Sequence, residues 1–132
     1  MASPHTDPEQ TVSPEVRQLI ERHIRSATEI EVLLLLYRAP ETFWAASAAA
    51  TVVGASEQDV RAHFGRFEGA GLIERGRQAD AFRFAPRSEE ARAAVAALAT
   101  AYAENRNDVL RVVIGSLSQI SAFSNAFRFS GR

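Results

Sequence analysis

Three histidines are the side chains of this 132-residue chain best suited to acid–base or metal chemistry near neutral pH. His5 lies near the N-terminus, while His23 and His63 lie on two different expected helices, so their contexts do not suggest a common site. The chain has no cysteine, which excludes thiolate metal sites and cysteine nucleophiles. It also lacks a nucleophile elbow, a phosphate-binding glycine loop and a His-Glu metal pair. We therefore expect no enzymatic activity, no metal and no cofactor, and we interpret His23 as a packed helix residue.

The overall composition predicts one globular domain. Hydrophobic residues make up 46% of the chain and charged residues 23%, which is close to the average for folded proteins. The absence of cysteine is typical of a protein in the reducing cytoplasm. The longest apolar run, Val32 to Tyr37, is far shorter than the roughly 20 residues that cross a bilayer. We expect a cytoplasmic protein without a membrane segment.

The N-terminal region divides into a tail and a helix. Residues 1–12 lack the cationic stretch and apolar core of a signal peptide, and we predict a flexible tail there. Residues 13–132 are predicted to form the single domain. Ser13 and Pro14 are typical of a helix start, which predicts an N-terminal helix over residues 13–25. Its apolar residues recur at the spacing of one helical face: Val16, Leu19, Ile20 and Ile24.

A second helix begins after Ser26. Ser26 and Glu29 have the spacing of a reciprocal capping box, in which each side chain bonds the other residue's backbone N–H. Apolar residues then occupy almost every side of the helix, which predicts a central position in the fold. Ala39 and Pro40 end it, because the residue before proline disfavours helix.

The next segment predicts two short helices followed by a hairpin. Residues 48–53 are expected to be helical, Gly54 suits a sharp turn, and Ser56 caps a helix that starts at Glu57. Gly71 is placed to stop that helix. The helix has three residues predicted to be buried: Val60, Phe64 and Phe67. Two strands, Leu72–Arg75 and Ala81–Ala85, are then expected around a turn over residues 76–80.

This order resembles the winged helix-turn-helix fold of bacterial MarR-like and related transcriptional regulators. The resemblance covers residues 30–85, and the positions that match are Ala50, Gly54, Ser56, the buried Val60, Phe64 and Phe67, and Gly71-Leu72-Ile73. It implies a mainly α fold with a small β-hairpin wing, within residues 26–85. An N-terminal helix and a long C-terminal helix would be added to this unit.

The same resemblance implies a dimeric regulator that binds double-stranded DNA. Helix 57–70 would enter the major groove, and the wing over residues 72–85 would contact the backbone. Gln58 is suited to adenine and Arg61 to guanine or phosphate. The other implied DNA contacts are Ser56, Arg66, Arg75, Arg77 and Arg83.

Charge leaves a second function open. The whole chain has a net charge of −1, and residues 45–85 contain five arginines and five acidic residues, so the segment that would contact DNA is neutral. Counterion release, which drives binding to phosphates, would therefore be small for one subunit. Glu57 and Asp59 also place negative charge on the expected contact face. The alternative is a non-catalytic protein–protein interaction module built on the same fold.

The C-terminal segment, residues 86–132, is predicted to be helical and to mediate dimerisation or docking. Its apolar residues recur at steps of four and three, the spacing of a coiled-coil seam. The seam contains Val95, Leu98, Tyr102, Asn105 and Val109. Phe123 and Phe127 lie at helical spacing in the terminal stretch, which we expect to dock on the same chain or across a dimer; the alternative is a docking patch for another protein. The stripe either pairs with a second subunit, which we favour, or packs on the first helix of the same chain.

Three aromatic side chains suggest a further alternative. Tyr37, Trp44 and Tyr102 are candidates to line an effector site of the kind that MarR-like proteins have between their dimerisation helices and the winged unit. The simpler interpretation, which we prefer, is that these rings are part of the hydrophobic core.

Overall fold

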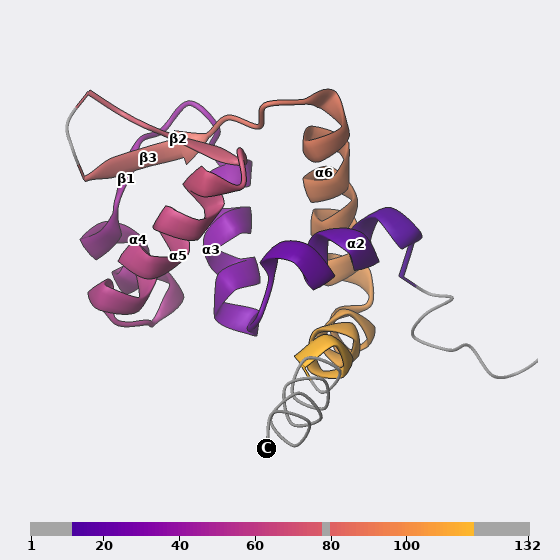
Figure 1. Ribbon diagram of the computed structural model, residues 1–132. Helices are drawn as coiled ribbons and strands as arrows, with labels where there is room; N and C mark the ends of the chain where they lie inside the picture. Colours follow the sequence, from indigo (N-terminus) through magenta and orange to yellow (C-terminus); the bar gives the residue numbers. More distant parts are fainter. Residues whose placement is uncertain (1–11, 78–79, 118–132) are drawn as a thin grey trace, which may run out of the picture.

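The computed structural model describes residues 12–77 and 80–117 and is mainly helical, with a small three-stranded antiparallel sheet (Figure 1). The elements in chain order are α2 (Pro14–His23), α3 (Ala27–Arg38), β1 (Trp44–Ala45), α4 (Ala46–Val53), α5 (Glu57–Gly69), β2 (Ile73–Arg75), β3 (Ala81–Phe84) and α6 (Glu89–Glu104). Residues 106–117 are also helical. The predicted mainly α class with a small sheet is confirmed. Within the described ranges, no helix combines the length and the apolar character needed to cross a membrane.

Serine side chains begin most of these helices. The Oγ atoms of Ser13, Ser26, Ser56 and Ser88 accept hydrogen bonds, 3.0 to 3.3 Å long, from the backbone N–H three residues further on. These bonds satisfy N–H groups that have no partner inside the helix. The helix starts predicted at Ser13, Ser26 and Ser56 are confirmed, whereas Ala45, the residue before α4, provides no side-chain cap.

The short connection between α4 and α5 depends on glycine. Gly54 ends α4 in the left-handed region at φ 76°, and Gly71 follows α5 at φ 78°, as both sequence positions predicted. A residue with a Cβ atom is strained at positive φ, whereas glycine is not. Ala49 and Ala50 of α4 are buried, and α4 packs against both α5 and α3.

The sheet has one strand more than the predicted hairpin. Its order is β1-β3-β2, and β2 and β3 form the expected hairpin, with Ile73 opposite Phe84. The additional strand β1 pairs Trp44 with Phe82 on the other edge of β3. A strand of two residues is too short to show an alternating pattern, so only its pairing with β3 reveals it.

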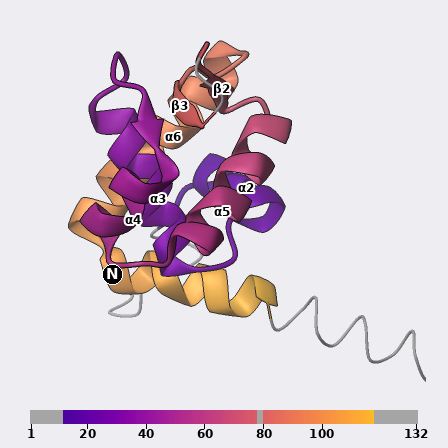
Figure 2. The same ribbon diagram turned by 90° about the vertical axis from the view of Figure 1, so that its left-hand side faces the viewer.

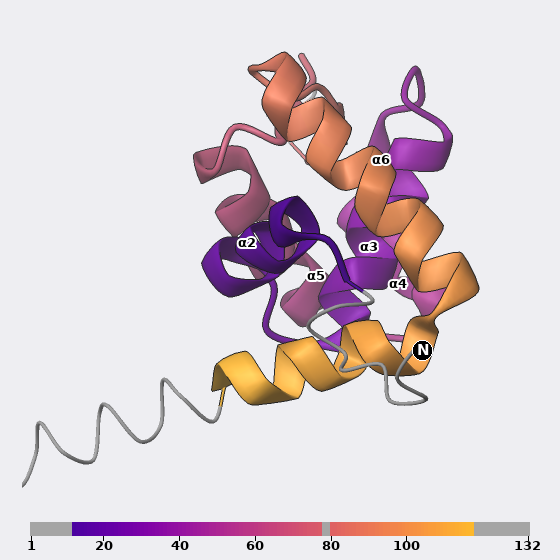
Figure 3. The same cartoon turned by 90° about the vertical axis from the view of Figure 1, so that its right-hand side faces the viewer.

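Helix α3 lies at the centre of the fold, as its apolar residues predicted. Ile30, Leu33, Leu34 and Leu36 are completely buried. Helices α4 and α5 pack on one side of α3, while α2 and α6 lie on another (Figure 3). Val12 is also in the core at 1% exposure, so the prediction of a flexible tail is wrong for this last residue. The rest of the tail, residues 1–11, lies outside the described residues.

The expected long C-terminal helix is interrupted at Asn105. Helix α6 ends there, with Asn105 at φ −139° and ψ 55°, and the 106–117 segment starts in a new direction below α2 (Figure 3). The backbone N–H of Asn105 donates to the Ala101 carbonyl, and its own carbonyl accepts from the Val109 N–H. Asn105 thus closes one helix and opens the next, and its side chain is exposed. The prediction of one continuous helix with Asn105 in an apolar seam is wrong.

The remaining described residues of that seam belong to the core of a single chain. Val95, Leu98 and Val109 are completely buried, and Tyr102 is 9% exposed. Helix α6 packs on α2 and α3, so the stripe uses the intrachain alternative rather than the one we favoured. Phe123 and Phe127 lie outside the described residues.

Candidate functional site

Helix α5 separates buried and exposed residues as its sequence predicts. Val60, Phe64 and Phe67 are at most 1% exposed and anchor the helix on the core. The opposite side carries exposed polar or small residues: Glu57, Gln58, Asp59, Arg61, Ala62, Gly65 and Arg66. Figure 2 shows α5 at the front of the molecule, with the β2–β3 hairpin above its C-terminal half. This surface of α5 and the hairpin is the candidate site.

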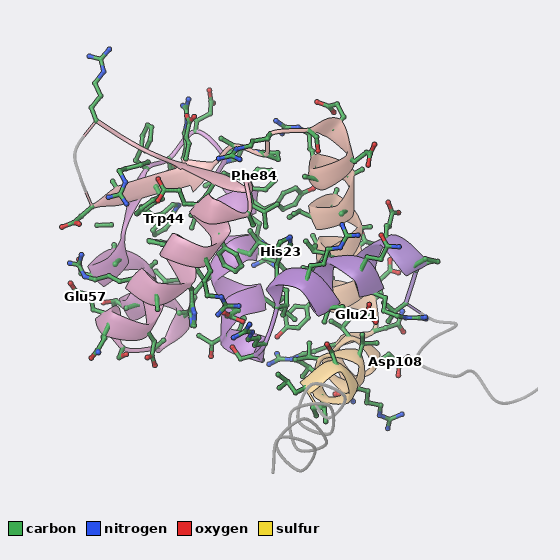
Figure 4. The ribbon with its side chains drawn as sticks, viewed as in Figure 1. Glu21, His23, Trp44, Glu57, Phe84 and Asp108 are labelled. Carbon is green, nitrogen blue, oxygen red and sulfur yellow. The ribbon has the colours of Figure 1, made fainter. Side chains whose placement is uncertain are left out.

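Arg61 is the polar centre of this surface. Its Nη2 lies 2.6 Å from Glu57 Oε2, one helical turn earlier, and its Nη1 lies 3.1 Å from Oδ1 of Asp80, the residue just before β3. Glu57 is the first residue of α5 and projects from the N-terminal end of this helix (Figure 4). The hydrogen bond to Glu57, and to a smaller extent the one to Asp80, raises the pKa of the Arg61 guanidinium. All three side chains are about half exposed or more, so each bridge is weak and exchangeable.

Two arginines of the hairpin are also paired with carboxylates. Arg75 lies over the Phe82 ring, 4.8 Å from its centroid, and 3.2 Å from Glu68. The Arg83 guanidinium is 2.7 Å from Glu74 and also contacts the Phe43 ring. The sequence predicted the exposed arginines but not their carboxylate partners.

The other predicted contacts have different settings. Arg77 is exposed in the loop after β2 and is the last described residue before the gap at residues 78–79. The Ser56 Oγ caps α5 by accepting from the Asp59 N–H, and its own O–H can still donate to another group. Gln58 is exposed in the first turn of α5.

A small cavity lies between α5 and the hairpin. Its volume is about 140 Å³, and it is lined by Ala46, Arg61, Phe64, Gly65, Arg75, Asp80 and Phe82. The two guanidinium groups and the Asp80 carboxylate are its charged components, and the aromatic rings form an apolar wall. A larger cavity of about 420 Å³ between α2 and the start of α6 has lining residues of both charges, including Glu15, Arg22 and Glu90.

Beneath α5, a buried carboxylate joins three helices. Glu29 of α3 is 1% exposed, and its Oε2 accepts a hydrogen bond from Arg66 of α5 and lies 3.2 Å from His63 Nδ1. Arg66 also donates to the His23 carbonyl at the end of α2, over 3.1 Å. Arg66 was predicted to contact phosphate, but its guanidinium instead ties α5 to α2 and α3.

The Glu29 carboxyl remains ionised in this position. Burial alone raises its pKa, but His63, the backbone N–H of Arg25 and the charge of Arg66 outweigh burial and lower the pKa below its usual value. The capping-box prediction is partly wrong, because Glu29 Oε1 accepts from the N–H of Arg25 rather than from that of Ser26. Burial, followed by the charges of Arg22 and Arg66, lowers the pKa of His23. Among the described residues there is no group of three or more possible metal ligands.

The three aromatic residues considered for an effector site have core contacts. Tyr37 packs edge-on against Phe84, with ring centroids 5.3 Å apart. Tyr102 donates from its hydroxyl to Glu31 Oε2 over 3.1 Å. Trp44 is half-buried in β1, beside the hairpin (Figure 4).

Comparison of the chain with protein-family models, curated proteins and solved structures found no match in any of the three.

Proposed function

We propose that this protein is a DNA-binding transcriptional regulator with a winged helix-turn-helix fold. In this assignment α4 and α5 are the helix-turn-helix, α5 is the recognition helix, and β2 and β3 form the wing. The observation that carries the proposal is the exposed side of α5, which offers polar and small side chains beside an arginine-bearing hairpin. The order helix, tight turn at Gly54, helix and hairpin supports it.

The dimensions of α5 suit the major groove. Its 13 residues make a helix about 20 Å long, and the groove, about 12 Å wide, accepts one helix. Gln58 and Arg61 are three residues apart, so they lie on the same side and can reach neighbouring base edges. Arg75, Arg77 and Arg83 would contact the DNA backbone. We do not assign Arg66 to DNA, since Glu29 holds it.

Salt dependence and two arginine variants test this function. Binding to the DNA upstream of the protein's own coding sequence, followed by fluorescence anisotropy, should weaken steeply with added NaCl. Arg61→Ala should abolish the preference for that DNA over a scrambled duplex. Arg77→Ala should leave the preference and reduce the logarithmic salt slope by about 1 per subunit. No binding at low salt, or binding that salt does not weaken, contradicts the proposal.

We also propose that the regulator is a homodimer. The predicted seam is buried in one chain, so the contact has to use other residues. Ile114 and Leu117 are 63% and 37% exposed, and with the half-buried Leu110 they lie on one side of the 106–117 segment. Light scattering at micromolar concentration should give about twice the chain mass of 14.4 kDa. Ile114→Ser with Leu117→Ser should give the mass of one chain.

One observation favours the alternative, a protein-binding module. Arg61, Arg75 and Arg83 are each paired with a carboxylate, which reduces the positive potential that phosphates require. If the protein binds no DNA but co-purifies with a stable protein partner, this alternative is favoured. Loss of that partner from the Phe123→Ser, Phe127→Ser variant would assign the contact to the C-terminal segment.

A further inference from the structure

We propose that the cavity between α5 and the hairpin is a phosphate site that the Asp80 carboxylate occupies in the free protein. DNA would then bind only when a phosphate of its backbone replaces Asp80 at Arg61. This inference rests on the proposed DNA binding and adds a regulatory feature to it: the wing carries an internal competitor of the DNA backbone.

The arrangement of charges around the cavity supports the exchange. Glu57 bonds the Nε and Nη2 atoms of Arg61, while Asp80 bonds Nη1. Glu57 can therefore keep the guanidinium oriented when Asp80 leaves, and Nη1 becomes available to a phosphate oxygen. Arg75, stacked on Phe82, lines the same cavity from β2. Phosphate is the anion that suits this set, because guanidinium groups bind its oxygens with two parallel or adjacent N–H donors.

Asp80 is well placed to leave. Its side chain is 66% exposed, and among the described residues its ion pair is with Arg61. An exposed bridge of this kind breaks at little cost. The cavity of about 140 Å³ exceeds the roughly 30 Å³ share of one water several-fold, so there is room for a phosphate group once the carboxylate moves.

The local charge balance explains why Asp80 has to move. Three carboxylates, Glu57, Glu68 and Asp80, bond the two arginines that line the cavity. With all of them in place the group has an excess negative charge, which repels a phosphate. Departure of Asp80 removes this excess and frees a donor at the same step.

Asp80→Asn tests the exchange against a matched control. Asp59→Asn removes the same charge from an exposed position in the first turn of α5, but Asp59 is not an ion-pair partner of Arg61. Asp80→Asn should tighten binding to duplex DNA about two- to fivefold more than Asp59→Asn does, the range expected for losing one exposed bridge. In an Arg61→Ala background the two substitutions should have equal effects. Equal effects already in the unmodified background, or a difference that persists without Arg61, overturn the inference.

Inorganic phosphate separates this inference from the proposed function. In NMR spectra at constant ionic strength, phosphate should shift the Arg61 and Arg75 Nε–Hε signals, with stronger binding to Asp80→Asn than to the unmodified protein. If phosphate binds in this way but no variant binds DNA, the site stands with free phosphate as its ligand, and the proposed function is wrong. If DNA binds and neither signal responds to phosphate, the function stands and the phosphate site is refuted.

Discussion

The strongest prediction about folding stability concerns the buried carboxylate of Glu29. Glu29 connects α3 to α5 through Arg66 and His63, and it accepts the backbone N–H of Arg25. Glu29→Gln keeps the size of the side chain and one acceptor oxygen but removes the charge. Glu29→Ala removes the charge and both acceptor oxygens, and it leaves the Arg25 N–H and the Arg66 guanidinium without this partner.

The expected magnitudes follow from exposure. Removing one member of a fully buried ion pair costs about 3–5 kcal/mol, because the other charge stays buried without a partner. Arg66 is 39% exposed and can be hydrated after the change, so we expect about 2–3 kcal/mol for Glu29→Ala. Glu29→Gln replaces charge-assisted hydrogen bonds by neutral ones, for a loss of about 1–2 kcal/mol. For a domain of this size each kcal/mol lowers Tm by about 4 °C.

Urea unfolding followed by circular dichroism measures these values. The matched control is Glu21→Gln, which removes the same charge from an exposed position of α2 and should change stability by less than about 0.5 kcal/mol. The reasoning is refuted if Glu29→Gln is no more destabilising than this control. A second check is Arg66→Ala, which should give a smaller additional loss in a Glu29→Gln background than in the unmodified protein.

Three further predictions concern pH and backbone geometry. The pKa of Glu29 in the folded protein lies below its unfolded value of 4.5. The contribution of ionised Glu29 to folding stability is therefore complete above pH 4.5 and is lost as the pH falls through the folded pKa. In acid unfolding below pH 4.5, the difference in stability between the unmodified protein and Glu29→Gln should narrow. The pKa of His23 lies below 6.5 in the folded state, so His23→Gln should reduce the loss of stability that accompanies acidification below pH 6.5; an unchanged pH profile would contradict this. Gly54→Ala, at positive φ, should cost about 1 kcal/mol in thermal melts, whereas Gly65→Ala, in a helix with open space around Cβ, should stabilise by a similar amount; equal effects would show that the backbone conformation is not the cause.

Helix starts and turns could be predicted from the sequence because they depend on residues close together in the chain. A serine side chain caps the N–H three residues on, and a glycine at the end of a helix takes the left-handed conformation without strain. The apolar spacing of α5 also depends only on helix geometry, so it correctly predicted which side of α5 faces outward. The exposed part of the candidate site could therefore be predicted from the sequence.

The partners of the charged residues could not be predicted, because they come from distant parts of the chain. Arg66 and Glu29 meet only when α5 packs on α3, and Arg61 meets Asp80 only when the hairpin lies beside α5. The strand β1 likewise exists only through its pairing with β3.

The sequence by itself determined the mainly helical class, the helix starts and the outward side of α5, since short-range hydrogen bonds and periodicity control these features. Only the tertiary structure decided which arginines remain accessible, because an ion pair depends on the position of both charges in space. It also decided the break at Asn105, where the chain turns so that Val109 reaches the core of the same subunit.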